Sequence, residues 1–109
     1  MKQYIFGEIV LLSFPLVNYS AIKKRPALVI FDAGDDDFLA ARITTQISRD
    51  KYDYEINNWK ESGLLKPSII RLDKIATLEK SLIIKKLGKL DKSEKKEAKL
   101  IFKMICESL

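Results

Sequence analysis

The sequence contains no histidine and only one cysteine, Cys106, among its 109 residues. The lack of histidine excludes Ser-His-Asp and Cys-His catalysis, histidine-ligated zinc, and ribonuclease chemistry that uses two histidines as acid and base. A lone cysteine excludes an intramolecular disulfide and a cysteine-based metal site. Any catalysis must therefore use other side chains, and a single free thiol is typical of a reducing compartment.

Long hydrophobic runs are also missing. No stretch approaches the ~18 apolar residues that a membrane-spanning helix needs. The N-terminus begins with a basic residue, but Glu8 interrupts the first apolar run and no small-residue cleavage site follows. These features predict a cytoplasmic protein without a membrane partner.

The composition fits one folded domain that spans residues 1–109. Hydrophobic residues make up 47% of the chain and charged residues 32%, which is enough to bury a core. Lys and Arg total 20 against 15 Asp and Glu, giving a net charge of +5. The positive charge favours a polyanion partner, nucleic acid first, although lysine-rich composition alone does not define a function.

Hydrophobic patterning predicts several short strands followed by one helix. Apolar runs bounded by turn residues predict strands over 8–14, 26–31, 38–45 and 68–75, with two shorter candidates at 52–56 and 82–86. Residues 16–25 are predicted to form a loop, and Gly88 to separate the strands from a helix over 93–107. Asp91 and Glu94 have the spacing of a capping box. This order predicts a small β-barrel with a packed C-terminal helix.

The predicted helix has an unusually broad apolar face. Its centre comprises Ala98, Ile101, Phe102 and Ile105, opposite a charged face of lysines. A face this broad predicts that two surfaces cover the helix, the barrel and a second subunit, and therefore a homodimer.

Several polar residues are candidates for a site. Arg71 and Asp73 lie two apart in a predicted strand, so both are expected on one face, with Ile70 and Leu72 facing the core. Spacing alone favours a surface ion pair worth less than ~1 kcal/mol. Arg25 closes a basic cluster before a strand, and such clusters either contact phosphate or remain solvated.

Two further features have a functional and a structural interpretation. The run Asp35-Asp36-Asp37 lacks the spacing of a calcium loop and is interpreted as a turn, so no metal site is predicted. Trp59, Tyr52 and Tyr54 are candidates for stacking on bases, but core or interface packing explains them equally well.

Five segments together resemble the PemK/MazF family of toxin endoribonucleases. They are GEIVLLSFP at 7–15, KRPALVI at 24–30, ITTQ at 43–46, PSIIRLDKI at 67–75 and LGKL at 87–90. The resemblance implies an SH3-like barrel with a C-terminal helix, usually a homodimer. It also implies metal-independent cleavage of single-stranded RNA, without a cofactor, and a cognate antitoxin whose tail occupies the RNA site.

The resemblance implies catalytic roles for Arg25 and Thr44, and in the PemK-like branch for Arg71 and Asp73. Neighbouring residues expected to bind RNA are Lys23, Lys24, Arg42, Thr45 and Gln46. RNA supplies its own nucleophile, the 2′-OH, for which Asp73 is the natural base. The arginines suit charge stabilisation on the phosphate better than proton donation, because guanidinium has a pKa above ~12.

Two alternatives use the same fold. One is a barrel that binds nucleic acid or an antitoxin without cleaving RNA. The other is a relative that acts on a protein target such as a topoisomerase. Cleavage of RNA in EDTA distinguishes the leading hypothesis from both.

Overall fold

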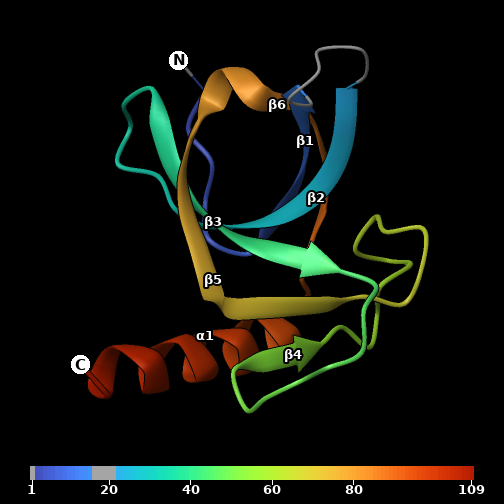
Figure 1. Cartoon of the computed structure of the whole chain (residues 1–109), viewed down its shortest axis with the longest axis vertical. Coiled ribbons are helices and arrows are strands. Elements are labelled where there is room, and N and C mark those ends of the chain that lie inside the picture. The colour runs from blue at the N-terminus through green and yellow to red at the C-terminus, as the bar shows by residue number, and fades with distance from the viewer. Residues whose placement is uncertain (1, 16–21) are drawn as a thin grey trace.

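The computed structural model describes residues 2–15 and 22–109, and its main element is one antiparallel sheet (Figure 1). The sheet has six strands in the order β4-β5-β3-β2-β1-β6. Their bounds are β1 Glu8–Pro15, β2 Ile22–Phe31, β3 Asp37–Thr44, β4 Asp53–Glu55, β5 Ile69–Glu79 and β6 Ile83–Lys89. A short 3-10 helix, η1, covers Lys80–Leu82, and the helix α1 covers Lys92–Glu107.

The sheet curls on itself, as the strongly bent β1 and β2 show in Figure 1. Within the described ranges its edge strands β4 and β6 are not paired with each other, so the barrel is partly open. The helix α1 packs at one end of this curled sheet, beside β4 and β5 (Figure 1). The predicted small barrel with a C-terminal helix is confirmed. Within the described part of the chain, no helix is long and apolar enough to cross a membrane.

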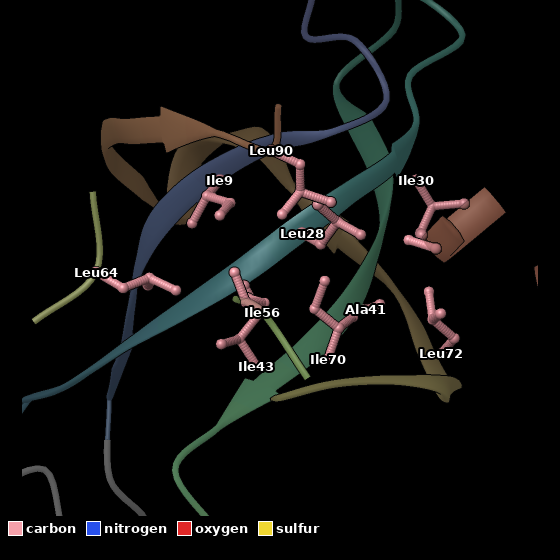
Figure 2. Packing of buried hydrophobic residues seen from close by; sticks show 11 residues of the cluster. Ile9, Leu28, Ile30, Ala41, Ile43, Ile56, Leu64, Ile70, Leu72 and Leu90 are labelled. Carbon is pink, nitrogen blue, oxygen red and sulfur yellow. The ribbon is translucent and has the colours of Figure 1, made fainter. Parts of the chain in front are cut away.

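Alternation along the strands places an apolar cluster on each face of the sheet. On β2, Leu28 and Ile30 join one cluster, whereas Ala27 and Val29 join the other. The first cluster, which Figure 2 shows, lies between the sheet and α1 and includes Ile9, Ile70 and Leu72. The second lies on the opposite face and contains Val10, Leu12, Ala27, Val29, Phe38 and Ala40.

Some predicted boundaries are wrong, and the first concerns β2. It begins at Ile22 rather than Pro26, so the cluster Lys23-Lys24-Arg25 lies in a strand rather than a loop. Pro26 pairs with Leu11 of β1, and pairing with β3 starts only at Ala27. The proline therefore lies beyond the β3 ladder, where its missing N–H is tolerated. The rest of the predicted loop, residues 16–21, lies outside the described residues.

The other boundary errors concern β5 and β6. Strand β5 continues to Glu79 instead of ending near residue 75, and it bends sharply along its length (Figure 1). Strand β6 runs to Lys89 and includes Gly88, which was predicted to separate strands from helix. Both extensions depend on cross-strand partners distant in sequence, which local patterns do not show.

The helix start follows the predicted capping pattern in part. Asp91 is the N-cap, and its Oδ1 accepts a hydrogen bond from the Glu94 N–H at 2.8 Å. The buried Glu94 carboxylate instead accepts from the N–H of Asn57 at 2.6 Å and the Tyr54 hydroxyl at 2.8 Å. Burial, together with this carboxylate, raises the pKa of Tyr54 above its ordinary value. Glu94 thereby fastens α1 to β4 and the loop after it.

Candidate functional site

A groove of about 700 Å³ opens on the sheet face opposite α1. Its apolar walls include Leu12, Phe14 and Ala27, and its polar residues are Arg25, Arg42, Thr44, Thr45, Gln46, Ser68 and Lys74. Among the described residues that line this groove, none is acidic. The groove is therefore an apolar cleft with a positive, hydrogen-bonding rim.

Strand register brings three predicted residues into this groove. Ala27 of β2 lies opposite Arg42 of β3. Arg25 precedes Ala27 by two residues, and Thr44 follows Arg42 by two. Because these strands are antiparallel, Arg25 and Thr44 therefore lie on the same face of the sheet and near the same end of the strand pair. Regular alternation therefore gathers Arg25, Arg42 and Thr44, although Arg25 was predicted to lie in a loop.

The cations of the groove are available to a ligand. Arg25 and Arg42 are exposed, and neither makes an ion pair with a described residue. The Thr44 Oγ1 accepts a hydrogen bond from the Gln46 N–H at 3.2 Å, which leaves the hydroxyl proton free to donate. Two planar guanidinium groups beside a hydroxyl form a site suited to an anion such as a phosphate.

The predicted RNA-binding residues divide between inside and outside the groove. Thr45 and Gln46 line it together with Arg42, whereas Lys23 and Lys24 do not. Alternation along β2 places Lys23 on the same face as Arg25, and Lys24 on the other face.

Arg71 lies beneath the groove and is buried. Its Nη1 donates to Asp53 Oδ2 at 3.0 Å, in an ion pair whose side chains are only 6% and 0% exposed. Its Nη2 donates to the Gln46 side-chain oxygen and the Ile47 carbonyl, both at 3.4 Å. The expectation of a surface ion pair is wrong for Arg71, but Gln46 connects its guanidinium to the groove wall.

A bulge in β5 explains why Arg71 and Asp73 differ in environment. Arg42 of β3 pairs with Arg71, but Ala41 pairs with Ile75, so residues 72–74 form an irregularity at the bend of β5. Ile70 and Leu72 face the apolar cluster beneath α1, as predicted. Arg71 stays in register opposite Arg42 and is buried by Asp53 and the loop after β3. Asp73 is exposed at the bend, outside the groove lining, whereas the adjacent Lys74 lines the groove.

Asp73 belongs to a group of three carboxylates. One oxygen each of Asp50, Asp53 and Asp73 lies within 4.8 Å of the others. Asp50 and Asp53 were not predicted as site residues, because their proximity to Asp73 arises from the pairing of β4 with β5. Lys74 was not predicted either. The only available signal was an acidic residue in the short candidate strand 52–56.

The remaining candidates have structural roles. Asp35 and Asp36 lie in the exposed turn before β3, as predicted, whereas Asp37 is the first residue of the strand. Tyr54 and Trp59 pack against the apolar cluster beneath α1, which supports their interpretation as packing residues.

A comparison with protein-family models matches residues 6–105 to the family described as "PemK-like, MazF-like toxin of type II toxin-antitoxin system". The chain belongs to this family. The match covers every strand of the PemK/MazF-like domain and nearly all of α1. A sequence comparison with curated proteins gives no match.

Solved structures of toxins share the fold. An endoribonuclease from a mycobacterial species superimposes with a TM-score of 0.77 at 15% identity, covering 98% of this chain and 94% of that one. Mycobacterium tuberculosis toxin MazF-mt6 gives 0.73 at 18% identity, with coverages of 92% and 96%. A MazE-MazF structure from Deinococcus radiodurans gives 0.75 at 17% identity, with coverages of 97% and 98%. At these identities the likeness shows the PemK/MazF fold.

Proposed function

We propose that this PemK/MazF-like chain is the toxin of a type II toxin–antitoxin system and a metal-independent endoribonuclease that cleaves single-stranded RNA. The observation that carries the proposal is the convergence of Arg25, Arg42 and Thr44 in a groove whose described lining contains no acidic residue. Two similar structures are described as endoribonucleases from mycobacterial species. A positive groove of this kind attracts the RNA backbone.

The reaction uses the RNA's own 2′-OH. Its oxygen bonds to the adjacent phosphorus, its proton passes to a base, and the bond from phosphorus to the 5′-oxygen breaks. The leaving 5′-oxygen takes up one proton, which balances the proton lost by the 2′-OH, so the products are a 2′,3′-cyclic phosphate and a 5′-hydroxyl. Arg25 stabilises the charge that develops on the phosphate oxygens, and Thr44 donates a hydrogen bond to them. Arg42, Thr45 and Gln46 hold the flanking nucleotides in the groove.

Asp73 is the proposed base. It is an exposed carboxylate next to Lys74, which lines the groove. In this proposal the RNA strand passes Lys74 and presents its 2′-OH at the bend of β5. Lys23 contacts the backbone beside Arg25, and Lys24 contributes longer-range attraction.

We assign Arg71 an electrostatic role in this reaction. Its guanidinium is buried in an ion pair with Asp53, and it contacts the groove through a hydrogen bond to the Gln46 side chain. A guanidinium in an ion pair stays charged, so Arg71 suits charge stabilisation rather than proton donation.

The proposed protein partner is a cognate antitoxin whose tail occupies the same groove. One similar structure is described as an endoribonuclease in complex with its cognate antitoxin, and another as MazE-MazF. The groove combines apolar walls with cations, a combination suited to an acidic peptide segment that carries hydrophobic side chains.

A homodimer in the cytoplasm completes the proposal. Leu100 and Met104, one helical turn apart on α1, are 48% and 45% exposed, although Ala98 and Ile101 already pack against the barrel. These two exposed apolar side chains support the prediction that a second subunit covers the outer side of α1.

Incubation of the purified chain with a long single-stranded RNA in EDTA tests the proposed activity. We expect discrete cuts, and a roughly 10²–10³-fold loss of kcat/KM for Arg25→Ala, the range for removing one donor to a developing oxyanion. Lys99→Ala removes a cation from the exposed surface of α1, on the opposite side of the sheet, and should cleave as the wild type does.

The outcomes distinguish the alternatives. RNA binding without cuts at any protein concentration would indicate a non-catalytic barrel. Neither binding nor cuts would favour a protein target. Cleavage that requires added metal and survives Arg25→Ala would overturn the site assignment.

A further inference from the structure

The three carboxylates beside Arg71 converge from separate segments. Asp50 lies in the loop after β3, Asp53 begins β4, and Asp73 lies at the bend of β5. One oxygen from each lies within 4.8 Å of the others. Asp50 and Asp73 are exposed, so the cluster is accessible from solvent.

Asp53 provides an independent indication that the cluster accommodates a ligand. Its side chain is 0% exposed, and its Oδ2 already accepts from Arg71 Nη1 at 3.0 Å and the Arg49 N–H at 2.8 Å. Its Oδ1 is also buried but has no hydrogen-bond donor among the described residues. A buried carboxylate oxygen without a donor is rarely left so in a folded protein, because its lost hydration is not replaced.

The local charge is also unbalanced. Three ionised carboxylates carry three negative charges, and Arg71 is the only described cation in an ion pair with any of them. The remaining charge equals that of one divalent cation.

We propose that Asp50, Asp53 and Asp73 bind a divalent cation, with calcium favoured over magnesium. Three carboxylate oxygens within 4.8 Å of one another can share one cation. Calcium takes several carboxylate oxygens in a flexible arrangement, whereas magnesium is usually bound through only one or two carboxylates and keeps most of its water. Water completes the coordination on the exposed side.

The consequence for activity rests on the proposed function. A cation bound to Asp73 removes this carboxylate from its role as the base. Calcium therefore inhibits RNA cleavage, whereas EDTA leaves cleavage intact.

Calorimetric titration of the full chain with calcium chloride, without RNA, tests the site directly. We expect one ion per chain and an affinity at least tenfold weaker for both Asp50→Asn and Asp73→Asn. Asparagine at position 50 retains an acceptor for the Tyr52 N–H, which Asp50 now caps at 2.9 Å, so the fold is preserved. Asp36→Asn, in the exposed acidic turn, is the matched control and should bind as the wild type does.

A second measurement locates the ion. Manganese, which prefers the same oxygen ligands, should broaden amide signals of residues 50–53 and 71–74 before those of 35–37. Absence of calcium binding, equal loss in Asp36→Asn, or uniform broadening would overturn the site. These results do not depend on RNA cleavage, so an inactive protein that binds calcium refutes only the proposed activity. If the chain cleaves RNA, Asp50→Asn should lose the calcium inhibition that the wild type shows.

Discussion

Arg71 is a buried cation whose only ion-pair partner among the described residues is Asp53. Both side chains have lost nearly all contact with water, so each depends on the other to offset the cost of desolvation. The same guanidinium also donates to Gln46 and to the Ile47 carbonyl. The pair therefore fixes the end of β3 and the loop after it, where Thr44 and Gln46 line the groove.

Removing the Asp53 carboxylate should destabilise the protein strongly. We expect Asp53→Ala to lower the free energy of unfolding by about 3–5 kcal/mol, because it leaves Arg71 buried without a partner. Asp53→Asn retains an acceptor and should cost less. Urea unfolding monitored by circular dichroism measures both values. A decrease in unfolding free energy of less than ~1 kcal/mol for Asp53→Ala would contradict the prediction, because that value is typical of a solvent-exposed ion pair.

At this scale, the sequence predicted residues on regular strands and failed at the bulge. Arg25 and Thr44 reach one groove because β2 and β3 alternate regularly around their pairing. The same reasoning misplaced Asp73, because residues 72–74 interrupt the register of β5 between Arg71 and Ile75. A bulge is defined by the pairing with the partner strand, so it could not be predicted from the local sequence alone.

At the scale of elements, the loop after β4 lies directly against β6. A Cβ on Gly63 would be 2.1 Å from the Leu87 carbonyl oxygen, and one on Gly88 would be 2.2 Å from the Ser62 oxygen. Only two glycines allow the backbones to approach this closely. The contact holds the loop that Glu94 also fastens to α1.

An alanine at Gly63 should separate these backbones. We expect Gly63→Ala to cost about 1–2 kcal/mol for the positive φ of +94°, and a further ~1–3 kcal/mol for overpacking. Gly34→Ala is the matched control, because φ there is +95° but the nearest atom beyond its chain neighbours, Gln3 Nε2, lies 3.9 Å from the added Cβ. Chemical denaturation compares the two variants, and equal losses would contradict the close approach.

A buried ion pair between Asp32 and Lys80 joins the N-terminal segment to the turn after β2 and to η1. Asp32 Oδ1 lies 2.8 Å from the Lys80 amine, and its Oδ2 accepts from the Tyr4 N–H at 2.8 Å. Burial alone would raise the pKa of this carboxyl, but the bonds from Lys80, Tyr4 and Gly34 outweigh it and lower the pKa.

The lowered pKa of Asp32 predicts acid-sensitive stability. Its contribution is fully present above the unfolded-state pKa of about 3.9 and is lost as the pH falls through the lower folded-state value. We expect the unfolding free energy to decrease below about pH 4, and less steeply in Asp32→Asn than in the control Asp36→Asn. Thermal melts across this pH range measure the slopes, and the same slope in both variants would contradict the prediction.

Secondary-structure features that depend on neighbours in sequence were predictable, whereas features that depend on distant segments were not. The N-cap at Asp91 was predictable because a cap is formed by neighbours in sequence. The bonds from Glu94 to Asn57 and Tyr54 were not, because they join segments almost forty residues apart. Boundaries of β5 and β6 were misjudged for the same reason.

For the whole molecule, the proposed dimer predicts twice the chain's mass in light scattering at micromolar concentration. Leu100 and Met104 form an exposed apolar stripe on α1. Leu100→Lys with Met104→Lys should shift the mass toward the monomer without unfolding the chain, because both side chains already contact solvent. A wild-type monomer at that concentration would refute the dimer.

The fold was predictable at this scale because it follows from repeated local patterns. Short alternating strands and one amphipathic helix allow few compact arrangements, and the order of motifs matched a known family. The position of Asp73 relative to the groove could not be predicted, because it depends on how β3 and β5 pair.

The most direct test of the account is a comparison of two oligonucleotides in EDTA. One is a single-stranded RNA that the chain cuts, and the other is identical except for a 2′-deoxy nucleotide before the cut. We predict that the RNA yields a 2′,3′-cyclic phosphate and a 5′-hydroxyl, and that the deoxy substrate remains intact at that position. Cleavage of the deoxy substrate there, or a product with a 3′-hydroxyl, would contradict attack by the 2′-OH.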